Sequence, residues 1–300
     1  MRFFGKSFFC RVARPIRPFP ACAPQFAATR HGVPPMSSLE KMLKVIDAFS
    51  EEAPVWTVDR LVEGLGTSRS TTYRYVKELC EAGFLAPVGG GGYILGPRII
   101  ELDRQIRHCD PMLTLGRDLV SDILPQVGEG IIFICGLVGD NVISVYRREN
   151  PNSLNISYSR GRPMPLFRGS ASRVILAHLP ERRAMKLFLY HRREIREAGL
   201  GSEWDAFRVN MWEIREQPYL SSRAQVDRGV FALSAPVFDG DGNILASLTL
   251  AIPEQRADRE DMDPLARVIV DGAARLGAAI AALAVRAGAG RVPVPIRRAV

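Results

Sequence analysis

The sequence has few of the residues that build cross-links and metal sites. Its 300 residues include five cysteines and four histidines. No two cysteines form a C-x-x-C pair, and no two histidines stand at i, i+4. This pattern argues against a disulfide framework or a zinc site and is typical of a reduced, cytosolic protein. We therefore expect a cytoplasmic chain without a metal.

Long hydrophobic runs are also absent. No segment approaches the ~18 unbroken apolar residues that a membrane-spanning helix needs, so we expect no membrane contact. Hydrophobic residues make up 47% of the chain, which is ordinary for a globular protein. A length of 300 residues suits two domains.

The sequence lacks the usual motifs of catalysis and cofactor binding. Ser170 and Ser172 are not part of a G-x-S-x-G motif, and the neighbours His108-Cys109-Asp110 point in different directions on a helix. The run 89–92 has four glycines but no following Gly-Lys-Ser/Thr, and 239–243 lacks the spacing of a calcium loop. We read these two runs as a flexible hairpin tip and a hairpin turn. The sequence predicts a protein that is not an enzyme, with no catalytic residues and no cofactor.

Acidic residues are missing from both ends of the chain. The formal net charge is +8, but residues 1–36 contribute six cations and residues 287–300 three, which leaves −1 for residues 37–286. Any attraction to nucleic acid in the body must therefore be local. We expect 1–36 to be a disordered tail or an over-extended start, in preference to a transit peptide, and 287–300 to be a disordered basic tail.

Residues 37–96 have the pattern of three short helices followed by a hairpin. Apolar residues recur at helical spacing in 39–49, 58–65 and 72–80, and the segments FLAPV and YILG flank the glycine run. Capping residues and glycines mark the helix ends: Ser37 or Ser38, Thr57, Ser68, Gly66 and Gly83. The layout predicts a winged helix-turn-helix DNA-binding domain.

The third of these helices presents a polar face that suits DNA. With Thr72, Tyr75, Val76 and Leu79 turned inward, hydroxyls and all the local cations lie on the other faces. Such side chains bind phosphates and base edges in the major groove. The candidate DNA-binding residues are Ser68, Arg69, Ser70, Thr71, Tyr73, Arg74 and Lys77. A solvated helix face is the alternative for any one of them.

The pattern of residues 97–286 predicts a linker helix and a second domain. Residues 97–110 are helical in pattern, with a break at Pro111. In 111–286 we expect a hairpin around 139–141, a third strand at 153–159 and a helix ending at Pro180. We further expect two charged helices at about 181–198 and 203–216 and a strand pair around 239–243. The second domain should end in an apolar helix.

Three segments together resemble one known family. TVDRLVEGLGTSRSTTYRYVKELCEAGFL, GRPMPLFRGSASRVILAHLP and SSRAQVDRGVFALSAPVFDGDGNILASLTL are similar to the winged-helix domain and the two effector-domain signatures of IclR-family transcriptional regulators. The resemblance covers about residues 38–285. It implies an α+β chain with a GAF-like α/β effector domain, homodimers or homotetramers, and ligand-controlled binding to operator DNA. It also implies control of genes for the metabolism of small organic acids or aromatic compounds.

The resemblance places an effector pocket between the two effector-domain signatures. The implied effector-binding residues are Ser170, Ala171, Ala232, Ser234 and Ser247, and the helix start adds Gly169 as a candidate. Small residues at a helix start leave backbone N–H groups that attract anions, and Arg168 beside them can pair with a carboxylate. We therefore expect a small carboxylic acid with an aromatic or aliphatic body. The alternative is that Arg168 is a surface cation and the small residues only permit close packing.

Two positions depart from the family pattern. Ser172-Arg173 replaces the usual Gly-Lys, and Ala224-Gln225 replaces the usual Gly-Glu. Because the region becomes more cationic, the effector is not taken over from the family.

The sequence favours a ligand-responsive regulator in which 97–110 couples effector binding to the spacing of two recognition helices on a palindromic operator. The alternative is an intracellular small-molecule-binding or assembly protein whose winged helix contacts another protein. Steep salt dependence is expected only for DNA binding.

Overall fold

A computed structural model describes residues 37–151, 156–157 and 159–286. The chain divides after Asp103 into two compact units, which are described separately below. The expectations for 1–36 and 287–300 lie outside the described residues.

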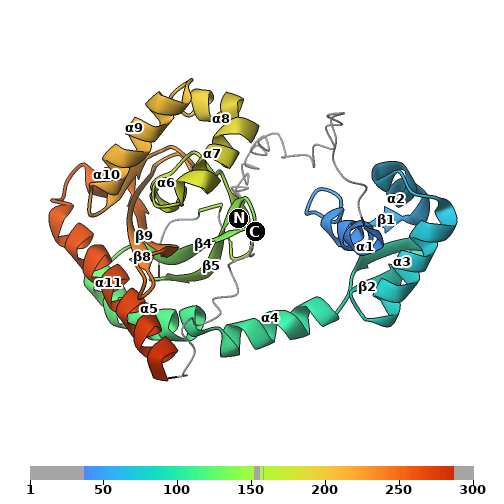
Figure 1. Ribbon diagram of the computed structural model, residues 1–300. Coiled ribbons are helices and arrows are strands. Elements are labelled where there is room, and N and C mark those ends of the chain that lie inside the picture. The colour runs from blue at the N-terminus through green and yellow to red at the C-terminus, as the bar shows by residue number, and fades with distance from the viewer. Residues whose placement is uncertain (1–36, 152–155, 158, 287–300) are drawn as a thin grey trace, which may run out of the picture. The chain divides into compact units, whose positions relative to one another are not determined.

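The first unit is built from three helices and a small sheet (Figure 1). Its elements are α1 (Ser38–Asp47), β1 (Trp56–Thr57), α2 (Val58–Leu65), α3 (Arg69–Glu81), β2 (Leu85–Val88), η1 (Gly89–Gly91) and β3 (Gly92–Leu95). The sheet order is β1-β3-β2, with antiparallel pairing. Six buried side chains form the core: Val45, Leu61, Tyr75, Val76, Leu79 and Leu85.

The predicted helix ends are confirmed. The side chains of Ser37, Thr57 and Ser68 cap α1, α2 and α3, each accepting a backbone N–H three residues later. Gly66, with φ of 62°, ends α2 in the left-handed conformation that suits glycine. The strand β1 was not predicted, because two residues are too few to show an alternating pattern.

The break expected at Pro111 separates two helices, α4 (Arg98–Cys109) and α5 (Pro111–Val127). Asp110 lies between them, and its carboxylate accepts the Met112 N–H at 2.8 Å. Proline at the first position of α5 needs no hydrogen-bond partner for its nitrogen. The sequence Asp110-Pro111 therefore ends one helix and starts the next.

The second unit has a six-stranded antiparallel sheet of order β6-β5-β4-β9-β8-β7. The strands are β4 (Ile131–Val138), β5 (Asn141–Glu149), β6 (Pro163–Met164), β7 (Leu220–Arg223), β8 (Val230–Phe238) and β9 (Ile244–Pro253). The helices besides α5 are α6 (Ser170–Ala177), α7 (Glu181–Tyr190), α8 (Arg192–Glu197), α9 (Trp204–Arg215), α10 (Glu254–Ala257) and α11 (Asp263–Arg286).

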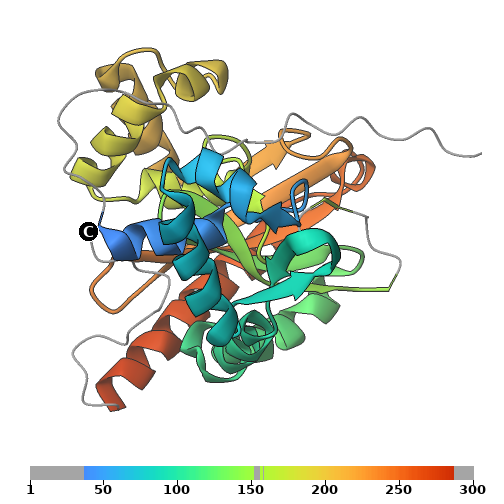
Figure 2. The ribbon, with the colours of Figure 1, turned by 90° about the vertical axis from the view of Figure 1, so that its right-hand side faces the viewer.

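Helices cover both faces of this sheet. Figures 1 and 2 show α5 and α11 side by side on one face and α6 on the other. Alternation along β9 explains the two layers, since Leu248 and Leu250 join the core under α5 and α11 while Ala251 joins the core under α6. The layer between α6 and the sheet contains the candidate effector site.

Two predictions for this unit need correction, and one strand was missed. A strand at 153–159 is wrong for its described residues Ile156, Ser157 and Ser159, and the short β6 pairs with β5 instead. The single helix at 181–198 is broken at His191, whose φ of −122° is not helical. The strand β7 was not predicted, because its sequence LSSR has one apolar residue and no clear alternation.

The hairpins expected at 139–141 and 239–243 are confirmed as the β4–β5 and β8–β9 connections. In the second, the Asp239 carboxylate accepts the backbone N–H groups of Asp241 and Asn243. Within the part of the chain that the structure describes, one helix, α11, is long and apolar enough to cross a membrane by length and composition. Its residues Leu265, Ile269 and Ile280 are buried against the sheet and α5, as in the core helix of a globular domain.

Candidate functional site

The helix α3 has one buried and one exposed face. Thr72, Tyr75, Val76 and Leu79 are buried, as the spacing predicts. The other side carries exposed side chains, namely Ser68, Arg69, Ser70, Tyr73, Arg74 and Lys77, while Thr71 is half-buried. Tyr73 is 58% exposed although it is aromatic. Within the first unit, the helix therefore turns its cationic and hydroxylated side outward.

Local contacts hold several of these side chains. Ser68 Oγ accepts the Thr71 N–H and lies 2.8 Å from Thr71 Oγ1, so its oxygen serves the helix cap. Arg69 pairs with Asp59 of α2 at 3.4 Å, and Lys77 pairs with Glu81 at 3.7 Å. Both ion pairs are well exposed, and such pairs hold their partners weakly. Arg69 and Lys77 can exchange these carboxylates for phosphates at small cost.

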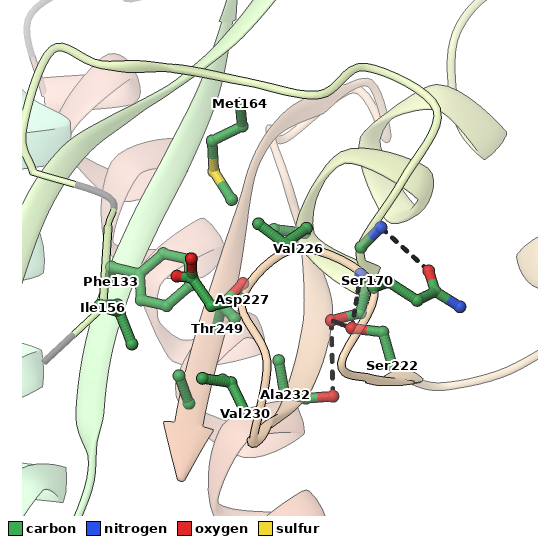
Figure 3. A pocket seen from close by; sticks show the side chains of 14 residues that line it. Phe133, Ile156, Met164, Ser170, Ser222, Val226, Asp227, Val230, Ala232 and Thr249 are labelled. Atoms are coloured by element: carbon green, nitrogen blue, oxygen red, sulfur yellow. Dashed lines mark hydrogen bonds between the residues drawn. The ribbon is translucent and has the colours of Figure 1, made fainter. Parts of the chain in front are cut away.

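A small cavity of about 40 Å³ lies between α6 and the sheet (Figure 3). The start of α6, the loop between β7 and β8, and the strands β4, β8 and β9 contribute its wall. The lining is mostly apolar: Phe133, Ile156, Met164, Gly169, Ala171, Val226, Val230, Ala232 and Ala251, with Ser170, Ser222, Gln225, Asp227 and Thr249 as the polar members. Asp227 is the charged residue among these, and no cation is.

Side chains of the β7–β8 region accept hydrogen bonds from the first backbone N–H groups at the start of α6. The Gly169 N–H donates to the Gln225 side-chain carbonyl, and the Ser170 N–H donates to Ser222 Oγ, both at 3.0 Å. Gly169 has φ of 77°, and a Cβ there would lie 2.8 Å from Val226. Glycine is therefore required both by the backbone and by the closeness of the loop.

A chain of hydroxyls crosses the polar end of the cavity. Ser234 Oγ donates to Ser170 Oγ at 2.7 Å, and Ser222 Oγ donates to the same atom at 3.2 Å. Thr249 Oγ1 lies 2.9 Å from Ser234 Oγ. Because the single Ser234 proton is directed to Ser170, Thr249 must be the donor in this last bond. Thr249 then faces the cavity with its acceptor capacity only.

The structure brings some of the candidate effector residues together and separates others. Gly169, Ser170, Ala171 and Ala232 line the cavity, and Ser234 lies behind them in the hydroxyl chain. Ser247 is fully buried and does not line the cavity, and its hydroxyl has no hydrogen-bond partner among the described residues. Arg168 is exposed and is not part of the lining. The arginine that was expected to bind the carboxylate of the effector therefore lies outside the cavity.

Arg173 stands where the family pattern has lysine, and it has a packing role here. Its guanidinium donates to the backbone carbonyls of Phe167 and Ala198 at 2.9 and 2.8 Å. Burial, and next the charge of Arg168, lower the pKa of Arg173 from its usual value. It ties the start of α6 to the turn after α8.

Sequence reasoning did not place Ser222, Gln225, Asp227 and Thr249 in the site, although it noted Gln225 as a departure from the family pattern. Thr249 carried one usable signal, since it is two residues from Ser247 and must share its face of β9. The other three lie on or beside a loop, where no periodic pattern marks the side that faces a cavity. Among the described residues, no cluster of three His, Cys, Asp or Glu side chains is arranged to hold a metal ion.

Family models match both units. The IclR helix-turn-helix domain matches residues 38–89, and the C-terminal domain of bacterial IclR transcriptional regulators matches residues 113–278. The chain belongs to the IclR family. It is thus a transcriptional regulator with an N-terminal helix-turn-helix and a C-terminal IclR domain, as the resemblance implied. Regulators of this kind act on DNA in the bacterial cytoplasm and are not enzymes.

Individual relatives agree with this assignment. The HTH-type transcriptional regulator KipR of Bacillus subtilis is 24% identical over 239 residues, which are 79% of this chain and 94% of KipR. An IclR-type regulator from a Silicibacter species has a similar fold, with a TM-score of 0.66 and 22% identity over 86% of this chain and 99% of its own. An IclR homologue from Microbacterium hydrocarbonoxydans, solved with 4-hydroxybenzoate, has a TM-score of 0.62 and 17% identity, covering 82% of this chain and 100% of its own. The two structures show the shared fold.

Proposed function

We propose that this IclR-family chain is a ligand-responsive regulator that binds a palindromic DNA operator through α3 and a small organic acid in the cavity beside α6. The observation that supports DNA contact is the outward face of α3, where Arg69, Arg74 and Lys77 stand beside exposed Tyr73. In a body of nearly neutral charge, these cations form a local target for phosphate.

Base contacts are proposed for the middle of α3, and phosphate contacts for its start. The hydroxyls of Ser70 and Thr71 lie at the positive end of the helix, where phosphate binds readily. Arg74 is one turn further along, and its guanidinium is exposed above the ring of Tyr75 at 5.8 Å. An arginine so placed can pair with both acceptors of a guanine edge.

A homodimer or homotetramer is proposed, because two copies of α3 about one DNA turn apart fit the two halves of a palindrome. DNA binding also implies association with the nucleoid. We further propose that α4 and the following joint at Asp110 carry the effector signal between the units.

The proposed effector is a small carboxylic acid with an apolar or aromatic body. Apolar residues cover most of the cavity, and the start of α6 supplies backbone N–H groups at its polar end. The IclR homologue with 4-hydroxybenzoate supports an aromatic acid by fold likeness. An acid oxygen that reaches the Gly169 N–H must replace the Gln225 carbonyl, which occupies it here.

Fluorescence anisotropy on the DNA upstream of this chain's own gene tests the DNA-binding part of the proposal. Arg74→Ala should weaken binding about tenfold or more, because an exposed guanidinium contact to DNA is lost. The matched control is Arg267→Ala, which removes an equal charge from the exposed side of α11. Equal affinities for the two variants would show that α3 is not the DNA-binding helix.

Salt dependence distinguishes the regulator from an assembly protein whose winged helix contacts another protein. Wild-type affinity for DNA should fall linearly with salt on a double-logarithmic plot, because each phosphate contact releases counterions. A flat plot would favour the protein partner.

A further inference from the structure

The β7–β8 loop, residues 224–229, lies directly over the cavity. Three consecutive loop residues, Gln225, Val226 and Asp227, belong to the lining. Figure 3 shows Val226 and Asp227 facing the space between Phe133 on one side and Ser170 on the other. The loop thus supplies three adjacent lining residues that belong to no regular helix or strand.

The base of the loop is fixed mainly by backbone hydrogen bonds. The Ala224 N–H donates to the Val230 carbonyl, and the Glu254 N–H donates to the Gly229 carbonyl, both at 2.8 Å. Arg223 also forms exposed ion pairs with Glu254 and Asp258. Ala224 has φ of 49°, the one positive value at a non-glycine residue in the described part of the chain. A left-handed alanine is strained, so the surrounding contacts must hold the turn in place.

The tip of the loop is held by side chains. Strand pairing between β7 and β8 stops at Arg223 and Phe231. Beyond it, the Gln225 carbonyl accepts the Gly169 N–H at 3.0 Å, and the Asp227 carboxylate accepts the N–H and hydroxyl of Ser157 at 3.0 and 2.6 Å. Side-chain hydrogen bonds of this kind are few here, and each contributes modestly to the stability of the folded state. The tip can therefore separate while the base stays in place.

The cavity is too small for the proposed effector unless the tip of the loop moves away. Its volume is about 40 Å³, whereas a cavity that accommodates benzene is roughly 150 Å³. An acid with an aromatic body cannot enter while Val226 rests against Gly169.

We propose that residues 224–229 form a lid over the cavity, latched by the Gln225–Gly169 and Asp227–Ser157 hydrogen bonds and opened when these break. The inference rests on the proposed function only in taking the cavity as the effector site. Loss of the hydrogen bonding at either Gln225 or Asp227 raises the fraction of molecules in which the lid is open. It does not alter the wall formed by α6 and the strands.

A thiol placed inside the cavity measures opening without any ligand. Ala251 lines the cavity and is 1% exposed, so the thiol of Ala251→Cys reacts with a methanethiosulfonate reagent only when the lid opens. Peptide mass spectrometry separates this thiol from the five native cysteines. Gln225→Ala and Asp227→Asn should each speed the reaction about three- to tenfold, the range expected for one lost hydrogen bond.

Matched controls are Gln217→Ala and Asp118→Asn, which make the same changes at exposed positions away from the lid. They should leave the rate unchanged. If Ala251→Cys does not fold, Ala171→Cys places the thiol at another lining position, which is 2% exposed. Equal reaction rates in the latch variants and the controls would overturn the lid.

Addition of 4-hydroxybenzoate or benzoate separates the lid from the proposed effector class. A reaction rate that rises in the latch variants and falls when an acid is added supports both the lid and the effector class. A rate that responds to the latch variants but to neither acid supports the lid and counts against aromatic acids as effectors. An acid that protects the thiol while the latch variants have no effect retains the effector class and removes the lid.

Discussion

Ser234 and Ser170 meet through their hydroxyl groups at 2.7 Å, although they are 64 positions apart in the chain. This bond joins β8 to the first residue of α6 and lies at the centre of the hydroxyl chain. Ser247 on the neighbouring strand β9 is equally buried, yet its hydroxyl has no partner among the described residues. The two serines therefore make a matched pair for mutation.

Ser234→Ala should lower the free energy of unfolding by about 1–3 kcal/mol, because Thr249 loses the acceptor of its buried hydroxyl. Ser247→Ala should be neutral or stabilising, since it removes a buried hydroxyl that has no hydrogen bond. Urea unfolding of both variants beside wild type measures the difference. Equal destabilisation by the two would contradict the hydrogen-bond assignment.

Asp110→Asn should change how stability depends on pH. Burial raises the pKa of the Asp110 carboxyl from its usual value of 3.8, against the opposing effects of the N–H groups of Met112 and Leu113 and of the charge of Arg160. Because the folded state holds this proton more firmly than the unfolded state, the group's contribution to stability is largest below pH 3.8 and falls as pH rises through the folded pKa.

Asparagine keeps an oxygen for the Met112 N–H and does not ionise. The stability of Asp110→Asn relative to wild type should therefore increase from about pH 4 towards neutrality and then level off. Thermal unfolding across this range provides the measurement, with Asp118→Asn as an exposed control. A pH-independent difference would show that Asp110 ionises as freely as in the unfolded chain.

Asp59→Asn should strengthen DNA binding. Asp59 pairs with Arg69 across the α2–α3 turn at 3.4 Å and places a negative charge beside the proposed phosphate contacts. Removal of the charge should raise affinity about threefold at low salt, and added salt should reduce the gain because both groups are exposed. An unchanged affinity would place Arg69 away from the DNA.

Arg168→Ala should leave acid binding within about twofold of wild type, because an exposed guanidinium outside the lining is screened by solvent. Isothermal titration with a panel of carboxylic acids makes the comparison, with Arg267→Ala as the control for lost charge. A large loss specific to Arg168→Ala would restore it as the carboxylate partner.

The elements that sequence reasoning located carry local signals. The caps Ser37, Thr57 and Ser68 and the left-handed Gly66 act within a few residues of where they stand, so their pattern is visible in one short window. The buried face of α3 follows from helical spacing alone. The missed strands β1 and β7 are short, and only pairing with β3 and β8 makes them strands.

The sequence by itself determined two mixed helix-and-strand domains, the polar outer face of α3 and the small residues at the start of α6. Only the tertiary structure decided which side chains meet in the cavity. Ser222, Gln225 and Ser234 reach the start of α6 because β7 and β8 pair at the sheet edge beneath it, and Arg168 turns away to solvent. Contacts across 50 or more positions depend on strand order and helix packing, which no local spacing encodes.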